Sequence, residues 1–179
     1  MEVSFVRTQG QRDRIYVKRS NGTEVSWVFP TFGNYIPHDL VHLVVEAAFG
    51  LCNGFWGRVD AGIDVARINA DANRIGGVNK YASFGPDQAD LYAAEALAAT
   101  RWGDSTLTDS DLLASIAAAN AKRARVTLER IELVRRTLDG LCARWIELLP
   151  KGALRIEFNP LDPETSFVRL AAEHCSKRP

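Results

Sequence analysis

The spacing of the apolar residues changes after residue 30, and this change limits the folds that are open to the chain. In the first 30 residues apolar and polar side chains alternate, as in half-buried strands, and the alternating runs are Val3–Phe5, Ile15–Val17 and Val25–Phe29. From residue 36 to residue 150 the apolar residues recur every three or four positions, the spacing of amphipathic helices. We therefore predict an α+β fold, in which an antiparallel meander of three or four strands at 1–30 packs against a mostly helical body at 36–150.

A turn and a later strand complete the predicted sheet. Asn21-Gly22 separates the second and third alternating runs, and because both residues tolerate positive φ we expect a type I′ hairpin turn there. Alternation returns at Leu154–Phe158, which predicts an additional strand at 153–158 for the same sheet.

Four helices are expected between these strands, with a loop around Gly76-Gly77: Pro37–Leu51, Trp56–Ala66, Pro86–Trp102, and Thr108–Leu149 with a break near 117–120. The last of them carries an apolar stripe at spacings of three and four: Leu128, Ile131, Val134, Leu138, Leu141, Trp145 and Leu148. We expect this stripe either in the core or at the seam of a homodimer. Residues 159–179 are predicted to be a tail with a short helix at Ser166–Glu173, and no repeat or linker divides the single domain 1–179.

The charges and cysteines bear on the class of protein. Lys and Arg number 22, as do Asp and Glu, so the formal net charge is zero, whereas nucleic-acid binding depends on an excess of positive charge. No apolar run approaches the roughly 20 residues that span a bilayer, and the N-terminus lacks the features of a signal peptide. Cys52, Cys142 and Cys175 are odd in number and far apart, which is not a disulfide framework. We therefore expect a cytoplasmic protein without a nucleic-acid or membrane partner, with Cys52 and Cys142 as small core residues.

Two of the three histidines stand four residues apart, which points to a metal site. His38 and His42 are accompanied by Asp39 and, four residues after the second histidine, by Glu46. In a helix His38, His42 and Glu46 lie along one narrow strip, and two imidazoles one turn apart are a common way to hold a transition metal. This pattern predicts a divalent transition metal, zinc being the first choice. A metal-bound water would then be the reactive group, with Asp39 as the proton acceptor.

The pattern leaves open which acidic residue is the third protein ligand of the predicted metal. Glu46 lies on the correct face, but its Cα is about 12 Å along the axis from that of His38, at 1.5 Å per residue. Glu95 and Asp90, on the next long helix, are the other candidates, while Asp60 and Asp64 are weaker ones.

The motif also resembles known families. His38-Asp39-Leu40-Val41-His42 reads HDxxH, which resembles the HExxH helix of zinc metallopeptidases with the glutamate shortened to aspartate. It is also similar to the zinc motif of a family of ubiquinone biosynthesis, which has a further glutamate where this chain has Gly54. The wider stretch from Phe29 to Gly57 resembles a family of uncharacterised bacterial proteins, which implies a bacterial origin and assigns no activity.

The same residues have a plainer interpretation. Asp39 stabilises a helix N-terminus through the helix dipole alone, and His42 and Glu46 are compatible with an ordinary i,i+4 pair on a solvated face. Two functions therefore stay open. The first is a metal-dependent protein, which includes an enzyme that acts on a small molecule. The second is a non-catalytic module that dimerises through its long C-terminal helix. No dinucleotide, Walker or serine-hydrolase motif is present to name another reaction.

Overall fold

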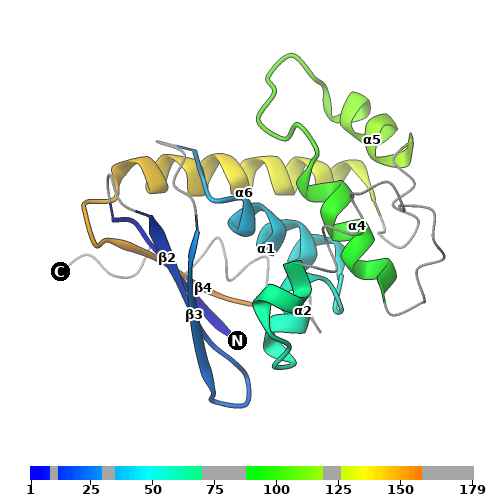
Figure 1. The fold of residues 1–179 in the computed structure, drawn as a ribbon. Coiled ribbons are helices and arrows are strands. Elements are labelled where there is room, and N and C mark those ends of the chain that lie inside the picture. Colours follow the sequence, from blue (N-terminus) through cyan, green and yellow to red (C-terminus); the bar gives the residue numbers. More distant parts are fainter. Residues whose placement is uncertain (9–11, 30–34, 70–87, 119–125, 159–179) are drawn as a thin grey trace.

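The computed structural model describes residues 1–8, 12–29, 35–69, 88–118 and 126–158. A four-stranded antiparallel sheet stands at one end of the molecule, and helices fill the rest (Figure 1). The strands are β1 (Glu2–Val6), β2 (Asp13–Lys18), β3 (Glu24–Phe29) and β4 (Ala153–Glu157). The helices are α1 (His38–Phe49), α2 (Phe55–Asp60), α4 (Ala89–Ala98), α5 (Asp109–Ala118) and α6 (Leu128–Glu147). The predicted α+β class is confirmed.

The sheet has the strand order β3-β2-β1-β4, so the strand predicted near the C-terminus does join the meander. Phe5 of β1 pairs with Ile15 of β2 on one side and with Leu154 of β4 on the other. Because side chains alternate between the two faces of a strand, these three residues share one face, and all three are buried. That face of the sheet forms one side of the hydrophobic core.

The β2–β3 hairpin turns at the predicted place but not with the predicted turn. A type I′ turn needs positive φ at both central residues, whereas in the described residues Gly22 has φ 84° and Asn21 is not in the positive region. The Gly22 N–H donates to Arg19 O at 2.9 Å, and the side chain of Asn21 accepts from the Thr23 N–H at 2.9 Å. These bonds describe a longer loop that ends in a left-handed glycine. The expectation of type I′ is wrong because the loop inside the Lys18–Glu24 pair is longer than two residues and only Gly22 takes positive φ.

Helix α1 forms the centre of the body. It packs against α2, α4 and α6, and every residue from His42 to Phe49 is buried. The carbonyl of Pro37 accepts the first helical bonds at its N-terminus, and Gly50 ends the helix in the left-handed conformation with φ 66°. A polar side chain on the inner part of this helix is therefore enclosed by protein on several sides.

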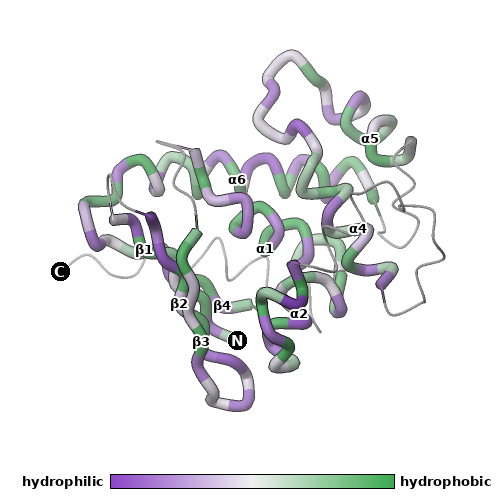
Figure 2. The backbone as a smooth tube through the Cα atoms, in the orientation of Figure 1, coloured by the Kyte–Doolittle hydropathy of each residue, from purple (hydrophilic) through white to green (hydrophobic). Residues whose placement is uncertain are grey.

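The stripe of α6 lies in the chain's own core. Hydrophilic and hydrophobic residues alternate in short steps along this helix (Figure 2), and five stripe members are buried: Ile131, Val134, Leu138, Leu141 and Trp145. Leu128, at the start of the helix, is 47% exposed. The homodimer expected through this helix stays a prediction.

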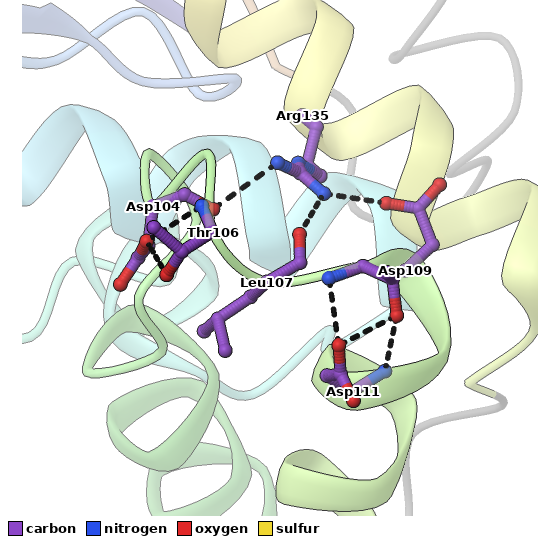
Figure 3. A network of polar contacts seen from close by, with 7 residues as sticks. Asp104, Thr106, Leu107, Asp109, Asp111 and Arg135 are labelled. Atoms are coloured by element: carbon purple, nitrogen blue, oxygen red, sulfur yellow. Dashed lines mark hydrogen bonds and ion pairs between the residues drawn. The ribbon is translucent and has the colours of Figure 1, made fainter.

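Arg135 fastens the segment before α5 to α6 (Figure 3). Its guanidinium donates to the carbonyl of Leu107 at 3.0 Å, to the carboxylate of Asp109 at 2.8 Å and to the carbonyl of Asp104 at 3.3 Å. One planar donor group thus holds three acceptors of this segment.

Several of the sequence predictions differ from the structure or lie outside its described residues. The helix expected over Trp56–Ala66 stops at Asp60, and Gly62 follows with φ 86°. Cys52 is exposed in the turn between α1 and α2, so its assignment to the core is wrong, while Cys142 is half-buried. The expected Gly76-Gly77 loop and tail helix lie outside the described residues. Within the described ranges, none of the helices is long and apolar enough to cross a bilayer.

Candidate metal centre

The two histidines of α1 lie one above the other, as their spacing predicts. The ring centroids of His38 and His42 are 4.8 Å apart, with the ring planes inclined at 76°. His38 is the first residue of the helix and is exposed, whereas His42 is one turn further into the body and 4% exposed. The pair therefore runs from the protein surface into the core.

His42 lies between two carboxylates that face opposite nitrogens of its ring. Nδ1 is 3.6 Å from Oε1 of Glu46, on the same helix, and Nε2 is 3.7 Å from Oε1 of Glu95, on α4. Glu46 is fully buried, while the side chain of Glu95 is 32% exposed. The sequence-predicted residues His38, His42, Glu46 and Glu95 are thus brought to one place, with Glu95 on the side that opens to solvent.

This geometry corrects the solvated-face interpretation of the strip. His42 and Glu46 are buried, and only His38 of the strip is exposed. Burying a charged or polar group without compensation costs several kcal/mol, on the order of 2–7 for a neutral one. The His42–Glu46 pair is therefore an internal polar pair that the fold must accommodate.

Glu46 is held by the start of helix α2. Its Oε1 accepts the Phe55 N–H at 2.8 Å and its Oε2 accepts the Trp56 N–H at 2.9 Å. Gly54 makes room for the carboxylate, because a Cβ at that position would lie 2.5 Å from Cδ of Glu46. Glu46 therefore fills the space that a side chain at position 54 would need.

Asp39 is tied to two indole groups. Its Oδ2 accepts from Nε1 of Trp27 at 3.2 Å, and its backbone carbonyl accepts from Nε1 of Trp56 at 2.9 Å. Trp27 also lies against Phe55 and Trp56, with ring centroids 6.1 and 5.8 Å apart. These contacts fix the first turn of α1 against the sheet, and they occupy one oxygen of the predicted catalytic base.

The charges around the histidines act on their protonation. Burial lowers the pKa of His38 below its ordinary 6.5, and the neighbouring His42 lowers it further. For His42 burial again acts downward, but the adjacent carboxylate of Glu46, with the charges of Glu95 and Asp39, outweighs it and raises its pKa above 6.5. Burial raises the pKa of Glu46 from 4.5, against the hydrogen bonding and charge of His42. The surface histidine is therefore the one more readily neutral.

The other acids named as possible ligands are engaged elsewhere. Asp90 accepts the Asn53 N–H at 3.0 Å, and Asp60 accepts the Ser20 N–H and hydroxyl at 2.7 and 2.8 Å. Asp64 is exposed and caps the turn that follows it by accepting the Arg67 N–H at 3.2 Å. None of these bonds involves either histidine.

Sequence reasoning missed the groups that position the site. Phe55 and Trp56 are buried in the core, and their backbone N–H groups also hold Glu46. The signal that could have found this role is Gly54, a residue without a side chain directly before two large aromatic ones. As the side chains stand, no three His, Cys, Asp or Glu residues of the described ranges are gathered closely enough to hold a metal ion.

Comparison with known proteins adds no family to these observations. No family model, no curated protein and no solved structure matches the chain. The resemblance of residues 29–57 to uncharacterised bacterial proteins stays a prediction, and the function has to be inferred from the site itself.

Proposed function

We propose that this protein binds one divalent transition metal, zinc in the first place, through His38, His42 and Glu95. The observation that carries the proposal is the placement of His42, whose Nε2 faces the carboxylate of Glu95 while the ring of His38 lies 4.8 Å from its own. Two imidazoles and one carboxylate are a donor set that suits zinc, iron and manganese.

The separation of Nε2 and the Glu95 oxygen supports this assignment. At 3.7 Å the two atoms are too far apart for a hydrogen bond. Two ligand atoms that are each about 2.1 Å from a tetrahedral zinc ion lie about 3.4 Å apart. The observed spacing is therefore close to the edge of a coordination tetrahedron, and a small movement of the Glu95 side chain closes it.

The side chains that would have to move are the exposed ones. His38 is exposed and Glu95 is partly exposed, so both can change rotamer at little cost, whereas the buried His42 supplies a fixed point. Glu46 faces the opposite nitrogen of His42 and so cannot reach the same ion. The metal that we propose would thus bind at the protein surface, on the Nε2 side of His42, and Glu46 would lie on the opposite, Nδ1 side of the ring.

Three protein ligands leave a coordination position open, as in catalytic zinc sites. A metal bound there would lower the pKa of its water ligand and supply Lewis-acid chemistry. Asp39, three residues before His42 and on the same turn as His38, is the acid that we propose as proton acceptor, through the oxygen that Trp27 does not bind. Hydrolysis of a small molecule is the reaction class that such an arrangement supports.

Zinc binding to purified variants tests the proposal. Equilibrium dialysis against micromolar zinc at pH 7.5 should give stoichiometric binding to the wild type and none to His38→Ala/His42→Ala, which keeps the helix because alanine is the better helix former. Glu95→Gln should weaken binding at least tenfold, while Glu132→Gln, on the exposed side of α6, is the matched control and should bind like the wild type. Equal, substoichiometric zinc in all four proteins would refute the metal site.

A further inference from the structure

We propose that Glu46 is the positioning residue of this site and that it couples metal binding to the start of helix α2. The inference rests on the proposed metal site, and it concerns a residue that we do not place among the ligands. One buried carboxylate faces His42 on one side and receives two backbone N–H groups of α2 on the other.

The first step concerns the proton of His42. Its Nδ1 is buried and has no hydrogen bond of ordinary length in the described residues, and Oε1 of Glu46, at 3.6 Å, is the acceptor that faces it. A neutral imidazole carries its proton on one nitrogen only. With that proton on Nδ1, directed at Glu46, Nε2 is free to bind a metal on the side of Glu95. A carboxylate behind a ligating histidine is the usual device for fixing its tautomer and orientation.

The second step concerns what holds Glu46. Both of its oxygens accept amide protons, from Phe55 at 2.8 Å and from Trp56 at 2.9 Å, and Gly54 leaves no atom between the carboxylate and the backbone. The carboxylate therefore cannot move toward Nδ1 without changing its bonds to α2, and the start of α2 cannot shift without moving the carboxylate. Metal binding at Nε2 makes the Nδ1–H group a stronger donor and so draws the Glu46 carboxylate toward it. Metal binding is in this way linked to the first turn of α2.

Such a link is reciprocal, because a free-energy coupling between two events acts equally in both directions. Zinc should slow the hydrogen exchange of the Phe55 and Trp56 amides. Conversely, a change at the start of α2 that touches no ligand should weaken zinc binding. Loss of an outer carboxylate typically lowers metal affinity about 10–100-fold, and this is the fold-change that we expect for Glu46→Gln.

The test compares zinc affinity in four proteins and reads the tautomer of His42 in one. Glu46→Gln removes the charge, and Gly54→Ala keeps the charge but places a Cβ 2.5 Å from the Glu46 carboxyl carbon, which must then shift. Asp60→Asn changes the other end of α2, where the carboxylate binds Ser20, and is the matched control. We expect the first two variants to lose at least tenfold in affinity, the control to keep it, and ¹⁵N NMR of the metal-free wild type to place the His42 proton on Nδ1.

The outcomes separate the two proposals. Wild type that binds no zinc refutes the metal site and the coupling with it. Wild-type affinity in folded Glu46→Gln and Gly54→Ala, or a His42 proton on Nε2, refutes the coupling alone. The amide group of Glu46→Gln would face one of the two N–H donors, and this variant could fail to fold for that reason. The zinc affinity of Gly54→Ala and the tautomer of His42 in the wild type then test the coupling.

Discussion

Trp27 of β3 donates from Nε1 to Oδ2 of Asp39, in the first turn of α1, across 3.2 Å. The bond joins an edge strand of the sheet to the helix that carries both histidines. Trp27→Phe keeps an aromatic ring but removes the donor, and we expect the free energy of unfolding to fall by about 1.5 kcal/mol, the lower figure for a hydrogen bond to a charged group. Urea unfolding measures it. Tyr16→Phe, at an exposed position of the next strand, is the control, and an equal effect of the two changes would contradict the assigned role of Trp27.

Zinc affinity should fall as the pH is lowered, because protons compete for the two imidazoles. The pKa of His42 is raised above 6.5 and that of His38 is lowered below it. Competition at His42 therefore begins above pH 6.5, with about one proton released per zinc, and rises to about two protons below the pKa of His38. Calorimetric titrations from pH 8 to pH 5.5 in buffers of different ionisation enthalpy count these protons. An affinity that does not change over this range would argue against histidine ligands.

Leu138→Ala tests whether the apolar stripe of α6 serves the monomer. Leu138 is buried in the chain's own core, so the change should lower the free energy of unfolding by about 2–5 kcal/mol. Leu133→Ala, at the surface of the same helix, should cost well under 1 kcal/mol. A dimer seam would give a different result: Leu138→Ala would leave the isolated chain as stable as before and lower the mass measured by light scattering at dilute concentration.

Arg135→Ala should loosen the segment before α5. The guanidinium has three acceptors there, on Asp104, Leu107 and Asp109, and its removal should cost about 1–3 kcal/mol. Arg136→Ala removes an exposed arginine whose partner, Glu132, is 3.7 Å away, and should cost less than about 1 kcal/mol. Thermal unfolding compares the two variants, and hydrogen exchange at Leu112 and Leu113 shows whether the loss is local to α5. Equal midpoints for both variants would mean that the network of Figure 3 contributes no stability.

Two glycines should respond to alanine in opposite directions. Gly22 has φ 84°, and Gly22→Ala should lower stability by about 1 kcal/mol although no atom lies within 4 Å of the new Cβ. Gly140 lies inside α6 with equally open surroundings and no positive φ, and Gly140→Ala should raise stability by about 0.5–1 kcal/mol. Chemical unfolding of both variants decides. A destabilising Gly140→Ala would show that the exposed face of α6 has a neighbour that the isolated chain lacks.

Local spacing was enough to predict much of this fold and part of its site. Alternation identified β4 as a partner for the meander, and the i,i+4 spacing placed His38 beside His42, because both patterns depend only on neighbouring residues. The turn at Gly22 was placed correctly, but its loop is longer than two residues, and the Asn21 side chain accepts the Thr23 N–H within it. No pattern in the backbone periodicity specifies which way that side chain turns.

The interior of the site could not be predicted in the same way. Glu46 was assigned to the correct strip of the helix, yet its burial depends on Phe55 and Trp56, which begin a different helix. Glu95 was named because the next helix was expected nearby, but its distance from Nε2 of His42 follows from how α1 and α4 pack. Contacts between separate elements are set by tertiary packing, and a single sequence carries little trace of them.

The close approach of Gly54 to Glu46 has an evolutionary consequence. A β-carbon at position 54 would clash with the carboxylate at position 46, so a side chain at 54 is disfavoured as long as Glu46 is present, whereas a shorter residue at 46 removes the clash. Chains that share this fold should therefore separate into two groups. One group keeps glycine at 54 with an acid at 46, and the other has a side chain at 54 with a shorter residue at 46. Intermediates that combine the two should be rare, and a laboratory selection that starts from Gly54→Ala should recover compensating changes at Glu46 first.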